Sequence, residues 1–361
     1  MSRRSWRKAV AAAGTAGILA APLLAAGPAH AATETETATL EVLASGLDNP
    51  RGITTLWDGT ILVAESGAGL PGCPEGETCV GNTGAVYKVK GDFKGRVATG
   101  LASTATGVAP GAPVSASGPE QAVPDYSGGY VVLSNLGGTT ASRAALGPDA
   151  GTLGTLFRTR DGKVLADLTD HETRLNPDGG EVHANPWRFT RSGSGYLVTD
   201  AGANTVVRAH RDGTTSTEYV VPTNATPQRV AESVPTGIVT GHDGTVYVAD
   251  MSGTVAGSAR IWKKAPGEQP EVLVTGLTNL VDLALDCSGN LYALSFTQGF
   301  QAGPPKPGLI SKIDLETKQV TDIPTGDQLQ QPTGLAVGPR GQLYVTNKSN
   351  GTDGELVRVR Y

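Results

Sequence analysis

A pattern that recurs six times along the chain is the feature that most restricts its fold. Each copy contains an apolar run entered after a proline or glycine, a tight glycine turn, a second apolar run and a terminal acid or amide. The clearest copies read NPRGI at 49–53 with DGTILVAE at 58–65, VPTGI at 234–238 with DGTVYVAD at 243–250, and QPTGL at 331–335 with RGQLYVTN at 340–347. One copy cannot bury its apolar faces alone, so the copies must stack on one another.

The spacing of the copies predicts an all-β, six-bladed β-propeller with four-stranded blades. The later copies follow one another at about 50 residues, close to the length of one propeller blade. The apolar runs are short, rich in β-branched residues and bounded by turn residues, which is typical of strands. The glycines of the six turns are Gly59, Gly129, Gly195, Gly244, Gly289 and Gly341.

The two ends of the repeat predict how the ring closes. The last copy ends after its third strand, whereas LEVLASGL at 40–47 is of the same type as the fourth strand VLVTGL at 272–277. We therefore expect the N-terminal strand to complete the last blade and remove its exposed edge. The propeller domain is then expected at 40–361.

The first 31 residues have the form of a signal peptide. Four basic residues near the N-terminus precede an Ala/Gly/Leu-rich segment and the small-residue cleavage site AHA at 29–31. We expect cleavage after Ala31, a flexible mature N-terminus at 32–39, and a secreted, extracellular protein. The segment SRRSW at 2–6 resembles a twin-arginine signal, which makes that export route an alternative.

The charge balance restricts the partners. Without the four basic residues of the leader, the chain has 25 Lys and Arg against 34 Asp and Glu, a net charge of −9. Nucleic acids and anionic membranes both require a basic surface, so neither is expected as the main partner. We expect a monomer that does not span a membrane after cleavage and binds a small molecule or an extracellular protein or glycan.

Three cysteines are present. Cys73 and Cys79 enclose a short loop, which in an exported chain predicts a local disulfide. A two-cysteine metal site is the less favoured alternative, because no histidine is near them in the sequence. Cys287 lies in the turn DCSG and is expected to remain an unpaired thiol.

Long insertions are expected on one face of the ring. Because the four strands of a blade alternate in direction, the connection between the second and third strands shares a face with the connection to the next blade. We call this the top face. Loops on a rigid scaffold carry function, which predicts binding at the top face; the alternative is that these connections simply tolerate length. The insertions lie at 66–83, 102–118, 136–150, 170–184, 223–233 and 296–307.

Residues near the starts of the inner strands form the candidate site. A charged side chain there faces the channel, as we expect for Arg51, Glu120 and Asp282. Ca²⁺ binds six to eight oxygens, so Glu120, Asn185 and Asp282 are candidate ligands for it. Arg51 opposes a cation and is able to pair with either acid or to bind an anionic ligand. The ligand-binding candidates are Arg51, Glu120, Asn185, Trp187, Asp282, His171 and His183.

Two further groups of polar residues have a structural interpretation beside a functional one. The insertion at 170–184 contains His171, His183 and several carboxylates, a set suited to a divalent metal or to acid–base chemistry. We favour a solvated loop with one helical turn at 170–175. Acids and amides at the ends of the second strands are expected to cap backbone N–H groups in the following turns. These are Glu65, Asn135, Asp200, Asp250 and Asn347.

From about residue 40 to 359 the chain resembles the ScyD/ScyE family of secreted bacterial propellers, which are related in pattern to NHL-repeat propellers. The resemblance rests on GLDNPRG at 46–52, CVGNTGAV at 79–86, NPDG at 176–179, VPTG at 234–237, GLTNLVDLA at 276–284 and PTGLAVGP at 332–339. It implies fold and export. The chain departs from the family at Glu120, where the pattern has a histidine after the proline.

A non-catalytic module that binds a ligand or protein through the top face is the favoured function. The sequence contains no GxSxG, HExxH or phosphate-binding loop. The alternative is a Ca²⁺-dependent hydrolase of lactones or esters. A quinone-dependent sugar dehydrogenase is less favoured, because no histidine is expected on an inner strand.

Overall fold

The computed structural model describes residues 37–226, 229–299 and 306–361. The expected signal peptide and cleavage site lie outside the described residues. The described residues form a six-bladed β-propeller of four-stranded antiparallel sheets, as predicted. Within these segments, no helix has the length and apolar character needed to cross a membrane.

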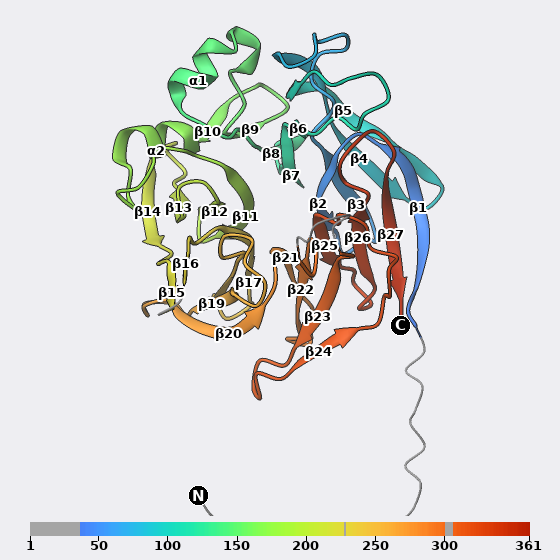
Figure 1. Ribbon diagram of the computed structural model, residues 1–361, viewed down its shortest axis with the longest axis vertical. Coiled ribbons are helices and arrows are strands. Elements are labelled where there is room, and N and C mark those ends of the chain that lie inside the picture. The colour runs from blue at the N-terminus through green and yellow to red at the C-terminus, as the bar shows by residue number, and fades with distance from the viewer. Residues whose placement is uncertain (1–36, 227–228, 300–305) are drawn as a thin grey trace, which may run out of the picture. The chain divides into compact units, whose positions relative to one another are not determined.

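The blades follow one another along the chain, and each begins with its innermost strand (Figure 1). The first blade contains β2 (Pro50–Thr55), β3 (Ile61–Glu65), β4 (Thr78–Lys90), β5 (Phe93–Thr106) and a short fifth strand, β6 (Ala116–Ser117). The second contains β7 (Pro119–Pro124), β8 (Tyr130–Ser134), β9 (Thr155–Arg158) and β10 (Val164–Asp167). The third contains β11 (Pro186–Ser192), β12 (Gly195–Asp200), β13 (Thr205–Ala209) and β14 (Thr215–Val220).

The remaining blades repeat this order. The fourth contains β17 (Pro235–Thr240), β18 (Val246–Asp250), β19 (Ala259–Lys264) and β20 (Glu271–Leu277). The fifth contains β21 (Leu280–Leu285), β22 (Leu291–Ser295), β23 (Leu309–Ile313) and β24 (Val320–Ile323). The sixth contains β25 (Gly334–Val337), β26 (Leu343–Asn347), β27 (Gly354–Arg360) and the N-terminal strand β1 (Thr39–Leu47).

The N-terminal strand closes the ring, as predicted. β1 pairs antiparallel with β27, from Thr39 opposite Arg360 to Leu47 opposite Gly354. The expected flexible segment at 32–39 extends too far, because Ala38 is buried and its N–H donates to the carbonyl of Pro324 at 2.8 Å. The ordered propeller therefore includes residues 38 and 39.

Apolar side chains between neighbouring sheets hold the blades together. Between the first and second blades, Leu62 and Val86 pack against Ala122, Val132 and Phe157, and all five are nearly or completely buried. Each sheet thus covers the face of the next, as the repeat predicts.

In four of the blades, the acid or amide at the end of the second strand fixes the connection that enters its own blade. Oε1 of Glu65 accepts from the N–H of Asp48 at 2.8 Å, and Oδ1 of Asn347 accepts from the N–H of Gln330 at 2.7 Å. These two therefore bind the preceding connection and not the following turn.

Asp200 and Asp250 bind both segments, whereas Asn135 differs from the expected cap. Oδ1 of Asp200 accepts from the N–H groups of Asn185, Gly202 and Ala203, and Oδ1 of Asp250 accepts from Val234 and Ser252. The amide of Asn135 instead donates to the carbonyl of Pro186 at 3.1 Å in the next blade.

Several top-face insertions have structure of their own. The ends of β4 and β5 extend beyond the first blade, where Cys73 and Cys79 form the expected disulfide. The insertion at 136–150 contains α1 (Thr140–Ala145) and η1 (Pro148–Ala150), and that at 223–233 contains β15 (Asn224–Thr226) and β16 (Arg229–Ala231). The insertion at 170–184 contains most of α2 (Leu168–Leu175), which is longer than the single turn expected.

We predict that the closing strand stabilises the whole ring. Leu47 is completely buried, whereas Val42 on the same strand is 50 % exposed. Leu47→Ala is expected to lower the free energy of unfolding by about 2–5 kcal/mol, because it leaves a cavity. Urea denaturation measures this loss. The matched change Val42→Ala is expected to cost far less, and equal losses for the two variants would contradict the packing described.

Candidate functional site

Two rings of side chains line the central channel at its top end. In the first five blades, the first residue of the inner strand pairs with the end of the second strand. In the sixth blade, Pro332 takes the corresponding place, two residues before β25. The next two residues supply what we call the mouth position and the inner position. The mouth positions are Arg51, Glu120, Trp187, Thr236, Val281 and Thr333. The inner positions are Gly52, Gln121, Arg188, Gly237, Asp282 and Gly334.

This register corrects the expected arrangement in two blades. Asn185 precedes the first residue of β11, so Trp187 takes the mouth position there, and Asp282 occupies an inner position behind Val281. The repeat pattern does not show which residue begins the pairing of an inner strand, and the pairing is interrupted directly after that residue in each of the first five blades.

Arg188 crosses the channel and joins three other blades. Its Nη1 lies 3.0 Å from Oε2 of Glu120, and its Nε lies 3.2 Å from Oδ2 of Asp282. Its Nη2 donates to the carbonyl of Thr333 at 2.6 Å. Arg188, Glu120 and Asp282 are each at least 96 % buried, so this is a desolvated charge cluster and not a surface ion pair.

Glycine at an inner position makes room for this guanidinium. A Cβ atom on Gly52 would lie 3.1 Å from Nε of Arg188 and 2.7 Å from the carbonyl oxygen of Glu120. Any larger residue at Gly52 would displace the arginine or the neighbouring strand. The glycine in the repeat NPRG therefore serves the charge cluster as well as the close approach of the inner strands.

Arg51 completes the cluster from above. Its Nε lies 3.3 Å from Oε1 of Glu120, and its Nη1 and Nη2 donate to the carbonyls of Ser349 and Ala116, both at 2.9 Å. All three nitrogens of the guanidinium are thus directed at protein oxygens. Arg51 pairs with Glu120, one of the two partners expected, and it ties the loops around the mouth together.

The charges of the cluster balance. Two guanidinium groups face two carboxylates, and burial raises the pKa of Glu120 and of Asp282 while Arg188 opposes that rise. Oδ1 and Oδ2 of Asp282 also accept the N–H groups of Leu283 and Leu335. A Ca²⁺ ion held by Glu120, Asn185 and Asp282 does not fit this arrangement, because the Arg188 guanidinium already lies between the two carboxylates.

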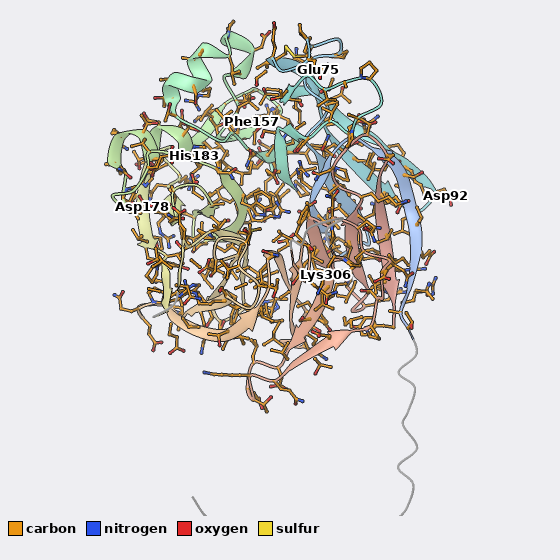
Figure 2. All side chains as sticks on the ribbon, viewed as in Figure 1. Glu75, Asp92, Phe157, Asp178, His183 and Lys306 are labelled. Carbon is orange, nitrogen blue, oxygen red and sulfur yellow. A yellow bond between two sulfur atoms is a disulfide. The ribbon has the colours of Figure 1, made fainter. Side chains whose placement is uncertain are left out.

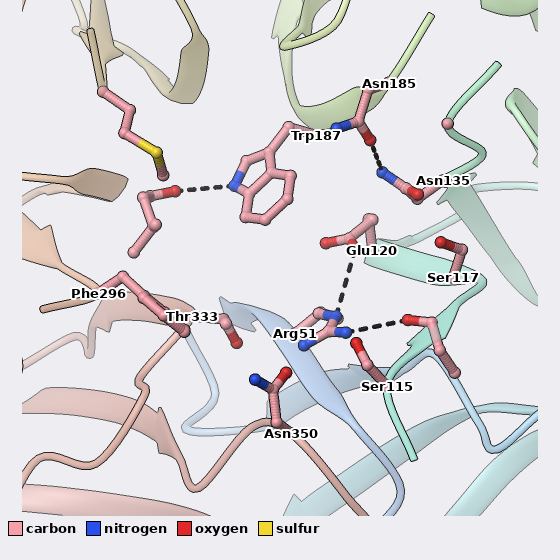
Figure 3. A pocket seen from close by; sticks show the side chains of 14 residues that line it. Arg51, Ser115, Ser117, Glu120, Asn135, Asn185, Trp187, Phe296, Thr333 and Asn350 are labelled. Atoms are coloured by element: carbon pink, nitrogen blue, oxygen red, sulfur yellow. Dashed lines mark hydrogen bonds and ion pairs between the residues drawn. The ribbon is translucent and has the colours of Figure 1, made fainter. Parts of the chain in front are cut away.

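A pocket of about 370 Å³ opens above the cluster (Figure 3). Trp187 and Phe296 line one side of it, and Ser115, Ser117 and Asn350 line the other. A second pocket of about 340 Å³ lies on the opposite side of the cluster and is lined by residues that include Arg188 and Asp282. The charge cluster therefore divides the channel into two separate hollows.

The wall of the top pocket is held in place by hydrogen bonds between blades. Nε1 of Trp187 in the third blade donates to the carbonyl of Val281 in the fifth at 2.9 Å, and the Arg188 guanidinium lies 5.5 Å from the centre of the indole ring. The side chains of Asn135 and Asn185 bond to each other at the edge of the pocket. The indole is thus presented as a fixed surface.

The two candidate histidines do not line this pocket. His171 is completely buried in α2, where its ring nitrogens lie 2.9 and 3.0 Å from the hydroxyls of Thr215 and Thr217. Burial lowers the pKa of His171, so its ring is neutral at pH 7. His183 lies behind Gly137, whose Cβ would be 3.4 Å from Nε2 of the histidine ring. Both histidines therefore serve the insertion and not the pocket.

Arg188 is the main site residue that sequence reasoning missed. The signal was present, because Arg188 stands where three other copies of the repeat have glycine. A long cation at a position reserved for glycine must extend across the channel. Its acceptors lie 68 and 94 residues away in the sequence, which the repeat alone does not pair with it.

Comparison with known proteins supports the fold. No family model matches the chain, and no curated protein matches it. Virginiamycin B lyase from Staphylococcus aureus is similar in structure at 15 % identity, over 90 % of this chain and 99 % of that one, with a TM-score of 0.50. A protein of unknown function from Bacteroides thetaiotaomicron is similar at 12 % identity, over 89 % of this chain and 72 % of that one, also at 0.50. Since one of these propellers is an enzyme, the fold leaves both catalysis and binding open.

We predict that removing the Arg188 charge destabilises the ring. Arg188→Met leaves Glu120 and Asp282 buried without their shared cation and is expected to lower the free energy of unfolding by about 3–5 kcal/mol. Arg191→Met is the matched control, because Arg191 is on the same strand and exposed. Chemical denaturation of both variants checks this, and a loss at Arg188 no larger than that at Arg191 would reject the interpretation.

The loss in Arg188→Met is expected to depend on pH. Burial raises the pKa of Glu120 and Asp282 and Arg188 opposes that rise, so removing Arg188 raises both pKa values further. As the pH falls, the folded variant therefore binds more protons than its unfolded state. Folding then becomes more favourable at lower pH. The deficit of the variant should be smaller at pH 5 than at pH 8 in unfolding curves recorded at both values. A deficit that does not change with pH would contradict uncompensated carboxylates.

Proposed function

We propose that the protein is a secreted propeller that binds a small, uncharged organic molecule in the top pocket without chemically transforming it. We also propose that it belongs with the ScyD/ScyE-type propellers that its sequence resembles. The observation that carries the binding proposal is the contrast between the two walls of the pocket. One wall is aromatic and the other carries hydroxyl and amide groups, above a floor whose charges already pair with one another.

The aromatic wall supplies contact area. Trp187, Met251, Val281 and Phe296 line the pocket, and the first two and Phe296 are only partly buried. A rigid indole provides a large apolar face at little entropic cost, and such residues dominate the energy of many binding sites. A planar ring lying on Trp187 fits this wall.

The opposite wall supplies orientation. The side chains of Ser115, Ser117 and Asn350 make no hydrogen bond to any described residue, and all three are at least partly exposed. Ligand sites combine mostly apolar walls with a few polar groups that fix the pose, in volumes of about 300–1,000 Å³. The pocket lies at the small end of that range, which favours a compact ligand with a hydroxyl or carbonyl group.

The floor of the pocket argues for binding over catalysis. Among the described residues that line it, only Arg51 and Glu120 titrate, and both are held within the charge cluster. A general base must be within hydrogen-bond reach of the proton that it removes. Glu120 is 98 % buried with a guanidinium beside each oxygen, so it is not available to a substrate.

The hydrolase alternative is not favoured by this arrangement. Calcium-dependent hydrolysis at the mouth needs carboxylates free to bind the ion, and Glu120 and Asp282 share Arg188 instead. Turnover of p-nitrophenyl acetate or of γ-butyrolactone that rises on addition of CaCl₂ would support the hydrolase and count against the present proposal.

A thermal-shift screen of small phenols, indoles and cyclic ketones tests the binding proposal. For a compound that stabilises the protein, Trp187→Ala is expected to weaken binding at least tenfold, or about 1.4 kcal/mol. Trp57→Ala is the matched control, because Trp57 is 91 % exposed and does not line the pocket. Tryptophan fluorescence of the Trp57→Phe variant provides the titration signal. Binding that is unaffected by Trp187→Ala and Ser117→Ala, or a screen without any stabilising compound, would refute the proposed site.

A further inference from the structure

Helix α2 borders a second set of polar groups, which is distinct from the charge cluster of the channel. The helix lies over the outer strand β14, to which it is fixed by the hydrogen bonds of His171 to Thr215 and Thr217. The neighbouring Glu172 is also completely buried. The carboxylate of Glu172 is therefore enclosed between α2 and the third blade, in the region where Asp178 and His183 also lie (Figure 2).

The carboxylate of Glu172 has no partner of normal geometry. Neither Oε1 nor Oε2 receives a hydrogen bond, although the side chain is 0 % exposed. The backbone N–H of His183 faces the group and offsets only part of the effect of burial on its pKa. A buried carboxylate without donors is costly unless a cation or a proton neutralises it.

Asp200 presents an unpartnered oxygen to the same region. Its Oδ1 accepts three backbone N–H groups at 2.6–3.2 Å, which fixes the orientation of the carboxylate. Its Oδ2 has no partner, and the residue is 0 % exposed. Gly202, whose N–H binds Asp200, lies against the backbone of His183, where a Cβ atom on Gly202 would clash with the His183 carbonyl oxygen, and His183 faces Glu172. The two carboxylates therefore lie in one region, and the charge of Asp200 raises the pKa of Glu172.

Among the residues that the structure describes, no basic side chain forms an ion pair with Glu172 or Asp200. Burial, together with the charges of Asp200 and Asp178, raises the pKa of Glu172 to about 7, and burial raises that of Asp200 to about 6. Arg174 on the same helix is exposed and lies 3.5 Å from the carboxylate of Asp170 instead. These two carboxylates thus differ from those of the channel cluster, each of which is paired with a guanidinium.

Two neutral oxygens complete the set. Oδ1 of Asn176 is buried without a partner, while the amide nitrogen of the same side chain donates to the carbonyl of Gly180 at 3.0 Å. Asn176 ends α2 in a left-handed conformation, one turn after Glu172. The hydroxyl of Thr205 is also unpartnered, and Thr205 pairs directly with Asp200 across the β12–β13 strands. Asp178 is excluded, because its oxygens accept from Gly180 and Asn204.

We propose that Glu172, Asp200 and Asn176 form a binding site for one Ca²⁺ ion, with the Thr205 hydroxyl as a further ligand. Both oxygens of Glu172, Oδ2 of Asp200 and Oδ1 of Asn176 give four unpartnered oxygen ligands. Ca²⁺ binds six to eight oxygens, which carboxylates, amides, backbone carbonyls and water are able to supply. Backbone carbonyls and water would therefore provide the ligands that these side chains do not. The ion neutralises the two acids and clamps α2 onto the end of β12.

The ligand chemistry selects Ca²⁺ over other common metals. Among the described residues, no three His, Cys, Asp or Glu side chains converge as a metal site, so a zinc centre rich in nitrogen or sulfur is not present there. Mg²⁺ retains several waters and demands near-octahedral geometry, which a buried set of bulky carboxylate and amide oxygens does not provide. This site shares no ligand with the calcium site expected at the channel mouth, although Asp200 binds the backbone N–H of Asn185, one of the ligands expected there.

Calcium titration of the mature chain, stripped with EDTA and dialysed, tests the proposal. Isothermal titration with CaCl₂ alone is expected to show one site. At a Ca²⁺ concentration about a hundred times Kd, the melting temperature should rise by about 4 °C. Glu172→Gln should weaken binding at least tenfold and abolish most of the shift. Asp170→Asn is the matched control, because Asp170 is on the same helix and exposed, and it should bind Ca²⁺ like the unmodified chain.

A second readout separates the ion from a simple effect on folding. In EDTA, Glu172→Gln should melt at the same temperature as the unmodified chain or higher, because the change removes carboxylate repulsion; with Ca²⁺ the order should reverse. Asp200→Asn should also weaken Ca²⁺ binding. Failure of the stripped chain to bind Ca²⁺, or binding undiminished in both variants, would overturn the proposal. A melting temperature that responds to pH near 7 but not to Ca²⁺ would overturn it in favour of a protonated Glu172.

Discussion

The interaction on which this ring depends is the crossing of its axis by Arg188. Most apolar packing joins neighbouring blades, whereas Arg188 in the third blade reaches Glu120 in the second, Asp282 in the fifth and Thr333 in the sixth. Arg51 adds the first blade through Glu120. Buried ion pairs contribute little net stability relative to apolar packing, but a mispaired one is heavily penalised. The cluster therefore fixes which blades face one another across the channel.

The cluster also determines what the top pocket is able to do. Because its charges cancel within the protein, the floor above it offers a ligand neither a free cation nor a free base. Recognition then falls to the walls, where the indole of Trp187 is anchored across the channel by its bond to Val281. A pocket with a neutral floor, one aromatic wall and one polar wall discriminates between ligands by their shape and by their hydrogen-bonding groups.

The sequence predicted the fold far better than the site. Propeller architecture, ring closure by the N-terminal strand and the Cys73–Cys79 disulfide follow from local pattern and were confirmed. The site depends on contacts between blades and on which residue begins the pairing of each inner strand, and the repeat pattern shows neither. Asp282 was therefore expected at the mouth, where the structure places Val281. The proposed calcium ligands could not be predicted for another reason: Glu172 and Asp200 are 28 residues apart, and the repeat pattern does not show that α2 packs against β9 and β14 of the sheets.

The pairing of β1 with β27 has a consequence for how such a molecule comes to be made. Thr39 lies opposite Arg360, so β1 has no partner until almost the entire chain has been synthesised. Long-range pairing of this kind is slow, because the entropy of closing a large loop is lost before any contact compensates for it. Until then the outer edge of β27 and the apolar side of β1 are both uncovered. Closure of the last blade is thus a late event in biogenesis. A chain that is truncated before this strand pairs leaves two unpaired, aggregation-prone strand edges exposed.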